Sequence, residues 1–187
     1  GLDVYGLVRS KIIQQNLELF KNVLISGDLD NPNILADLVK EYRPSVIINC
    51  AGITKHLQEC KDNVKAIEIN SLLPHKIVSI CQGTGTRIIQ ISTDCVFSGN
   101  KGNYTEEDIP DSKDIYGKSK YLGEILENNH LSIRTSTIGH EMTTKYGLLE
   151  WFLVQNKCMG YKNAIFSGIT TLELAKVIYK ILVYHKN

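Results

Sequence analysis

Short runs of apolar residues alternate along the chain with longer stretches in which apolar residues recur at helical spacing. Within each run nearly every residue is apolar, which is typical of strands that crossover helices bury on both faces of a parallel sheet. The alternation predicts an α/β fold with a Rossmann-like, doubly wound parallel sheet. The predicted strands are residues 4–8, 23–26, 46–50, 87–92 and 131–135.

Two of the predicted helices have recognisable ends. Asn31 is placed to cap a helix with Pro32 at its first position, and Pro44 ends that helix. Thr170 and Glu173 form a capping-box pattern ahead of a last amphipathic helix. Both patterns support the alternation of strands and helices.

The glycine cluster Gly83-Thr84-Gly85 precedes a strand, whereas the phosphate-binding turn of a dinucleotide-binding domain follows its first strand. We therefore expect a tight helix-to-strand turn here, and a domain that lacks its first strand-turn-helix. We assign residues 1–139 to an NAD(P)-binding Rossmann-type domain that is incomplete at its N-terminus. Residues 140–187 are expected to form a partial substrate-binding region with a closing helix.

Charge and cysteine usage limit the class of partner. The chain has 21 basic and 20 acidic residues and no long block of either sign, which favours a small-molecule partner over nucleic acid or a membrane surface. Five cysteines without a C-x-x-C pair indicate reduced thiols, and no apolar run or leader indicates a membrane span or export, so we expect a cytoplasmic protein. A second copy of the chain, in a homodimer, is left open as a further partner.

One group of residues has the chemistry of proton transfer. Tyr116 and Lys120 are four apart in a predicted helix, so both side chains lie on one face, where the ammonium can lower the pKa of the phenol from about 10. Thr93 follows a buried strand at the sheet edge where α/β proteins bind ligands. The pattern predicts an acid–base pair, with the Thr93 hydroxyl orienting the same substrate oxygen.

In these motifs the chain resembles the extended short-chain dehydrogenase/reductase family, and within it the dTDP-4-dehydrorhamnose reductases. The resemblance implies that Thr93, Tyr116 and Lys120 form a catalytic triad. It also implies that a nicotinamide cofactor delivers hydride to C4 of a nucleotide-linked 4-keto-6-deoxy sugar in polysaccharide biosynthesis. The segments that carry it are V-I-I-N-C-A-G (46–52), I-S-T-D-C-V-F-S-G (91–99), Y-T-E-E-D-I-P (104–110), I-Y-G-K-S-K-Y-L-G-E (115–124), I-R-T-S-T-I-G (133–139) and F-S-G-I-T-T-L-E-L-A (166–175).

The resemblance also assigns cofactor contacts. Arg9 ends the first strand, where a basic side chain can meet a 2′-phosphate, so NADP is expected, with NAD as the alternative. Four of the expected contacts also have a structural explanation. Asp28 is consistent with a turn residue, and Ala51 and Gly52 are consistent with tight packing. Asn70 is consistent with a solvated helix face. The expected cofactor-binding residues are Arg9, Asp28, Leu29, Ala51, Gly52, Asn70, Ser92, Tyr116, Lys120 and Thr135.

Substrate contacts are expected from residues near the triad and from the region after it. Trp151 lies where the family surrounds the sugar, although a lone Trp is more often a core or interface residue than a ligand platform. The acidic run 106–108 is expected to be a solvated loop, and no metal-ligand spacing is present. The expected substrate-binding residues are Thr93, Asp94, Cys95 and Trp151.

Two alternatives remain open at this stage. Cys95 stands where rhamnose-type reductases usually have an aromatic residue, and GDP-fucose synthases use a cysteine there with a loop histidine, to which His140 lies close. An epimerase/reductase using Cys95 and His140 is therefore one alternative, and a small buried thiol with an unrelated loop histidine is the simpler interpretation. The other is a non-catalytic NADP-binding regulatory subunit, similar to that of methionine adenosyltransferase.

Overall fold

The computed structural model describes residues 2–8, 24–27, 29, 31, 33–54, 62–127, 129–141 and 145–184. The described strands are β1 (Gly6–Val8), β2 (Leu24–Ser26), β3 (Val46–Asn49), β4 (Arg87–Ile91), β5 (Leu131–Ile133), β6 (Thr137–Ile138) and β7 (Ile169–Thr170). The described helices are α2 (Ile34–Tyr42), α3 (Asn63–Ile67), α4 (Leu73–Ile80), α5 (Ile115–Leu122), α6 (Leu148–Leu153) and α7 (Thr171–Tyr184). A π-helical turn, Glu68–Leu72, joins α3 to α4, and a 3₁₀ turn spans Asp94–Val96.

Every pairing among the described strands is parallel, as the sequence predicts. The sheet that carries the candidate site has the order β3-β4-β5, with β4 in the centre, and separate pairs join β1 to β2 and β6 to β7. Each of the five predicted strands is found inside its predicted range. Strands β3, β4 and β5 end one or two residues before their predicted ends. The fold is α/β with parallel sheets.

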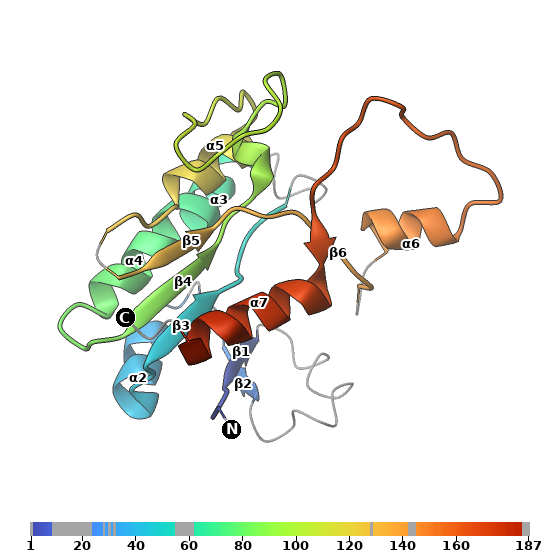
Figure 1. The fold of residues 1–187 in the computed structure, drawn as a ribbon. Helices are drawn as coiled ribbons and strands as arrows, with labels where there is room; N and C mark the ends of the chain where they lie inside the picture. The colour runs from blue at the N-terminus through green and yellow to red at the C-terminus, as the bar shows by residue number, and fades with distance from the viewer. Residues whose placement is uncertain are drawn as a thin grey trace.

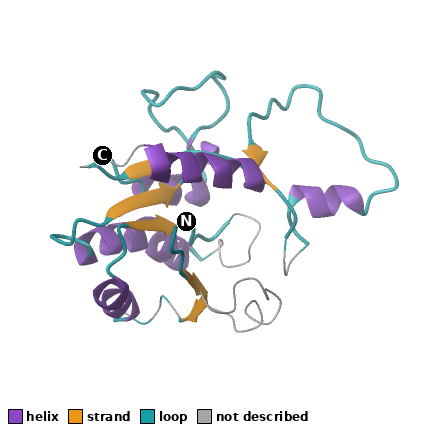
Figure 2. Ribbon diagram, turned by 60° about the horizontal axis from the view of Figure 1, so that its bottom comes forward, coloured by secondary structure: helices purple, strands orange, loops and turns teal. Residues whose placement is uncertain are grey.

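The core lies between α4 and one face of the β3-β4-β5 sheet. Ile88 and Ile89 of β4 are both fully buried, although adjacent residues of a strand point to opposite faces of the sheet. Helix α7 lies on the opposite side of the sheet from α4 (Figures 1 and 2). The buried cluster consists of Val39, Leu73, Ile77, Cys81, Ile88 and Ile125.

Local sequence signals explain most of the element ends. Gly83 and Gly85 both have φ of +76°, in the left-handed region that suits glycine, and they make the predicted turn between α4 and β4. The backbone N–H of Glu173 donates to Thr170 Oγ1 at 3.2 Å where α7 begins, as the capping box predicts. Arg43, also with positive φ, ends α2 ahead of Pro44.

The start of α2 differs from the prediction. Asn33, not Asn31, is the residue before the helix, and Asn31 Oδ1 instead accepts the backbone N–H of Asn33 at 3.1 Å. An asparagine that bonds the N–H two residues on forms a turn of its own, so the helix starts two residues later. Pro32 lies outside the described residues.

Within the described part of the chain, no helix is both long enough and apolar enough to cross a bilayer. The same residues contain no group of three or more His, Cys, Asp or Glu side chains arranged to hold a metal ion.

Candidate functional site

Thr93 occupies the turn that leaves the carboxyl end of the central strand β4. Its side chain is buried, and Oγ1 accepts the backbone N–H of Cys95 at 3.2 Å while it donates to Asp94 Oδ1 at 3.3 Å. These bonds start the 3₁₀ turn Asp94–Val96 and hold the Thr93 side chain against it. A structural capping role therefore accompanies any catalytic one.

Helix α5 brings Tyr116 and Lys120 to this strand end. Asp114 caps the helix, its Oδ1 accepting the Gly117 N–H at 2.7 Å. A Cβ added at Gly117 would lie 2.2 Å from the Cys95 carbonyl oxygen, so the helix rests directly on the turn after Thr93. Only glycine allows this approach. The sequence prediction that one helix face carries both side chains is confirmed.

Lys120 is a buried cation at the end of β4. Only 5% of the residue is exposed, and Nζ donates to the carbonyl of Ile91, the last residue of the strand, at 2.6 Å. Burial lowers the pKa of Lys120, while the charges of Cys50 and Glu124 oppose that shift. Cys50 is itself exposed at the end of β3, where desolvation raises the pKa of its thiol against the opposing effect of Lys120.

Asn70 is buried, so the interpretation of a solvated helix face is wrong. Its Oδ1 accepts the Ile53 N–H at 2.8 Å, and its Nδ2 donates to the Ile53 carbonyl at 3.0 Å and to Ser119 Oγ at 3.1 Å. Asn70 therefore joins the loop after β3 to helix α5. Gly52 lies in that loop, and a Cβ added there would lie 3.4 Å from Asn70 Oδ1 and 3.6 Å from Lys120 Nζ.

The π-helical turn around Asn70 has a local cause. Pro74 has no N–H to donate to the carbonyl of residue 70, and its ring excludes that carbonyl from the usual helical position. The helix widens ahead of the proline, and the Leu73 N–H donates to Glu68 five residues back. The Asn70 carbonyl is turned toward Gly123, where an added Cβ would lie only 1.9 Å from its oxygen. Such turns are frequent at functional sites.

A buried ion pair lies behind Lys120, and the sequence analysis missed it. Glu124 Oε2 accepts from Arg134 Nη2 at 2.8 Å, and Oε1 accepts from Arg134 Nε at 2.9 Å and from Ser92 Oγ at 2.7 Å. Ser92, expected at the cofactor, thus uses its hydroxyl in this network. One sequence feature could have indicated this ion pair: Glu124 stands four residues after Lys120, at the spacing that places two side chains on one helix face.

Asp94 links the ends of two strands. Ser136 Oγ donates to Asp94 Oδ1 at 2.5 Å, which joins the turn after β4 to the loop after β5. Thr135 Oγ1 donates to the Ser136 carbonyl at 3.2 Å in the same loop. The expected substrate contact Asp94 and the expected cofactor contact Thr135 are therefore held at one edge of the sheet.

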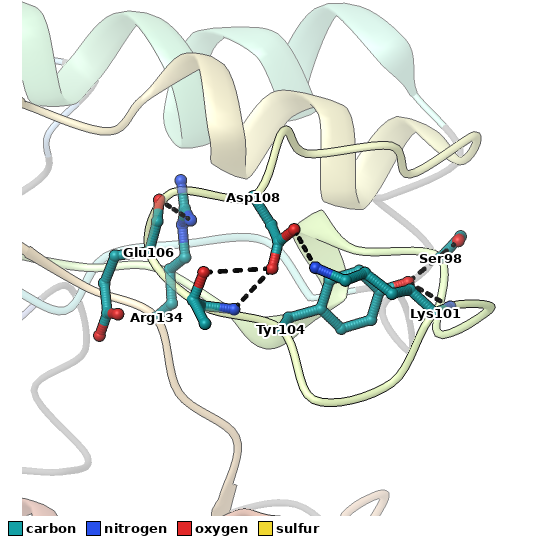
Figure 3. Close-up of polar contacts among 7 residues, drawn as sticks. Ser98, Lys101, Tyr104, Glu106, Asp108 and Arg134 are labelled. Carbon is teal, nitrogen blue, oxygen red and sulfur yellow. Dashed lines mark hydrogen bonds and ion pairs between the residues drawn. The ribbon is translucent and has the colours of Figure 1, made fainter.

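The loop between β4 and α5 has internal structure of its own. Asp108 forms an ion pair with Lys101 and accepts the Thr105 N–H at 2.7 Å (Figure 3). The hydrogen bond from Lys101 is the largest cause of a lowered pKa at Asp108. The expectation of a solvated acidic run therefore holds for the exposed Glu106 and Glu107 and is wrong for Asp108, which is half-buried.

Aromatic rings connect this loop to Arg134. The rings of Phe97 and Tyr104 stack with centroids 4.3 Å apart, and the Arg134 guanidinium lies over Phe97 at 5.1 Å. Arg134 also donates to the backbone carbonyl of Glu106 at 3.4 Å (Figure 3).

The remaining predicted site residues form no hydrogen bond or ion pair with Lys120, or they lie outside the described residues. Trp151 is exposed on α6, and His140 pairs with Glu150 through Nδ1 at 2.8 Å. Leu29 packs against the core cluster. Arg9 and Asp28 lie outside the described residues. Cys95 is half-buried in the turn after Thr93.

Comparison with known proteins assigns this arrangement to a family. The family model for the RmlD substrate binding domain matches residues 4–146, which include the whole β3-β4-β5 sheet and α5. The chain belongs to this RmlD family. The predicted resemblance to the dTDP-4-dehydrorhamnose reductases within the extended short-chain dehydrogenases/reductases is confirmed.

Two relatives illustrate the range of proteins in which similar sequences occur. A dTDP-4-dehydrorhamnose reductase of Streptomyces griseus is 32% identical over 115 residues, 58% of this chain and 38% of that protein. The methionine adenosyltransferase 2 subunit beta of Xenopus laevis is 32% identical over 95 residues, 49% of this chain and 28% of that protein. The chain therefore matches less than two fifths of the length of either relative.

Solved structures of RmlD-type reductases match almost the entire chain. A dTDP-4-dehydrorhamnose reductase from Clostridium acetobutylicum superposes with a TM-score of 0.75 at 27% identity, covering 100% of this chain and 71% of that one. The enzyme from Bacillus anthracis, solved in complex with NADP, gives a TM-score of 0.71 at 26% identity and covers 97% of this chain and 71% of that one. The Rossmann-like α/β architecture is thereby supported over the full chain.

Proposed function

We propose that this RmlD-family chain provides the cofactor-binding and catalytic residues of an NADPH-dependent reductase that acts on a nucleotide-linked 4-keto-6-deoxy sugar. The observation that carries the proposal is the buried ammonium of Lys120 at the end of β4, on the helix face that also bears Tyr116 and beside the turn of Thr93. The similarity to dTDP-4-dehydrorhamnose reductases over the same residues supports the substrate class.

The residues around Lys120 fit a nicotinamide cofactor. Gly52 has no side chain to fill the space beside Asn70 and Lys120, so a flat ligand can approach the backbone there. Ala51, Gly52, Lys120 and the loop at Thr135 would hold the ligand, and the bound nicotinamide supplies the hydride for C4. The NADP present in the Bacillus anthracis structure supports this assignment.

The side chains of this chain would supply the proton. Tyr116 donates its phenolic proton to the oxygen that was the C4 carbonyl, and Lys120 stabilises the phenolate that remains. Thr93 would orient the same oxygen by turning its hydroxyl proton from Asp94 Oδ1 toward it. Hydride at carbon and proton at oxygen together give the C4 alcohol.

The division of labour along the chain follows from this assignment. Residues 1–139 would hold the cofactor and the triad, and residues 140–187 would contribute to the sugar site. Trp151 is exposed on α6, which leaves its ring available to a sugar nucleotide. Cys95 and Asp94 would face the same ligand from the turn after Thr93.

The proposal is tested by following NADPH oxidation with a panel of dTDP- and GDP-linked 4-keto-6-deoxy sugars. We expect turnover with at least one member and formation of its C4 alcohol. Tight NADPH binding without oxidation by any member would refute the reductase proposal.

A second candidate is a non-catalytic NADP-binding subunit, because a methionine adenosyltransferase 2 subunit beta is as similar in sequence as the reductase. Under this alternative NADPH binds, no keto sugar is reduced, and the Tyr116→Phe variant behaves as wild type in every assay. Retention of Thr93, Tyr116 and Lys120 together favours the reductase.

Replacing Arg9 by Asp tests the cofactor preference. We expect NADPH binding to weaken by about tenfold or more and NADH binding to change little, because a carboxylate repels the 2′-phosphate that only NADPH carries. Titration of both cofactors measures the difference, and Arg43→Asp, the same charge change at the exposed end of α2, is the control. Equal losses for both cofactors would show that Arg9 does not meet the 2′-phosphate.

A further inference from the structure

Glu124 is a buried carboxylate that joins three elements behind the proposed catalytic residues. Its side chain is 1% exposed, and it follows the end of α5, four residues after Lys120. It accepts hydrogen bonds from Ser92, which follows β4, and from Arg134, which follows β5. One side chain thus fixes the end of α5 against the carboxyl ends of two neighbouring strands.

The same strand end is bonded twice by the α5 segment. Lys120 Nζ donates to the Ile91 carbonyl at 2.6 Å, and Glu124 receives the hydroxyl of the next residue, Ser92, at 2.7 Å. These two bonds fix the position of α5 along β4. Because Tyr116 lies one turn before Lys120 on that helix, its place relative to Thr93 depends on them.

Charge is also balanced around Glu124. Burial lowers the pKa of Lys120, and the charges of Cys50, at the end of β3, and of Glu124 oppose that shift. The groups acting on Arg134 are Glu124 first, then Tyr121 and Glu106. Glu124 is thus a buried carboxylate whose charge counters the desolvation of Lys120.

We propose that Glu124, held by Arg134 and Ser92, is a positioning residue that keeps Lys120 protonated and aligned on the last carbonyl of β4. The proposal rests on the proposed reductase function for its consequence in catalysis, since a charged Lys120 is what stabilises the phenolate of Tyr116. Arg134 has a second role: its guanidinium, stacked on Phe97, keeps the carboxylate in place.

The direct test is the titration of Lys120, which needs no substrate. Protein labelled with carbon-13 at lysine Cε is titrated by NMR in a Tyr116→Phe background, which removes the coupled phenol. The Lys120 signal is identified by its loss in Lys120→Met. Glu124→Gln is expected to lower the pKa of Lys120 by about one unit, because the opposing negative charge is gone.

Variants of Arg134 test whether Glu124 acts on Lys120 through its charge. Arg134→Gln is expected to raise the pKa of Lys120, because the charge of Glu124 is then less compensated. The double variant Glu124→Gln/Arg134→Gln leaves no unpaired charge and is expected to fall between Glu124→Gln and wild type, about half a unit below the latter. Glu41→Gln, an exposed carboxylate on α2, should leave the Lys120 titration unchanged.

A role in folding alone would lower the melting temperature of these variants and leave the titration where it is. A natively folded Glu124→Gln variant with the wild-type Lys120 pKa would therefore overturn the proposal. If either single variant fails to fold, the Lys120 pKa is measured in the double variant instead. A wild-type Lys120 pKa in the folded double variant would overturn the proposal.

Catalysis supplies an independent readout. In enzyme with Tyr116 intact, the alkaline limb of the pH–rate profile is expected to move to lower pH in Glu124→Gln by about the same unit, since Lys120 and Tyr116 both lose protons more easily. If the wild-type protein reduces no keto sugar, the proposed function fails, while the lysine titration still decides the role of Glu124.

Discussion

Replacing Tyr116 by Phe is expected to reduce turnover by about 100- to 10,000-fold, because the variant has no group to protonate the C4 oxygen. Binding of NADPH should stay within a few-fold of wild type, since the phenyl ring keeps almost all of the contact area. Steady-state NADPH oxidation and equilibrium cofactor titration measure the two effects separately.

Tyr121→Phe is the matched control, because Tyr121 lies on the same helix with its side chain exposed. It should retain wild-type turnover. If Tyr116→Phe also retained wild-type turnover while the protein reduced a keto sugar, the triad would have to be abandoned.

Replacing Gly123 by Ala is expected to cost roughly 3 kcal/mol of unfolding free energy. The added Cβ would lie 1.9 Å from the backbone carbonyl oxygen of Asn70 and 3.2 Å from Pro74 Cγ, and backbone cannot move aside as a flexible side chain can. The change would push α5 away from the π-helical turn that holds Asn70. Denaturant unfolding followed by circular dichroism measures the loss.

Gly160→Ala provides the comparison, because no heavy atom lies within 4 Å of the position its Cβ would take. Its unfolding free energy should stay within about 0.5 kcal/mol of wild type. Equal stability of Gly123→Ala and Gly160→Ala would mean that α5 does not pack on the Asn70 turn as described.

The sequence predicted the elements of the sheet because a strand buried in a parallel sheet has a strong local signature. The continuous apolar runs located β3, β4 and β5, and the residues directly after them, Ala51, Gly52 and Thr93, lie where the sheet ends. The spacing of Tyr116 and Lys120 was sufficient to place both on one helix face. Helical period and strand length are properties of a few adjacent residues.

Contacts between distant segments could not be predicted in the same way. The pairing of Glu124 with Arg134 depends on how the end of α5 packs against the residue that follows β5, which no local pattern encodes. The burial of Asn70 depends on a helix widened ahead of Pro74, and propensity alone suggests a surface position. The partner of Asp108 could not be predicted because Lys101 lies seven residues away, in the same loop as the Phe97–Tyr104 stack, and no local pattern pairs them.

The most direct test of the central proposal is to follow a labelled hydride. Wild-type protein is supplied with NADPH carrying deuterium at the transferable nicotinamide C4 position and with a dTDP-linked 4-keto-6-deoxy sugar. We expect one deuterium at C4 of the product sugar, detected by mass spectrometry and located by NMR, and none in the Tyr116→Phe variant over the same time. A wild-type protein that binds NADPH but transfers no deuterium to C4 of any 4-keto-6-deoxy sugar would contradict the account.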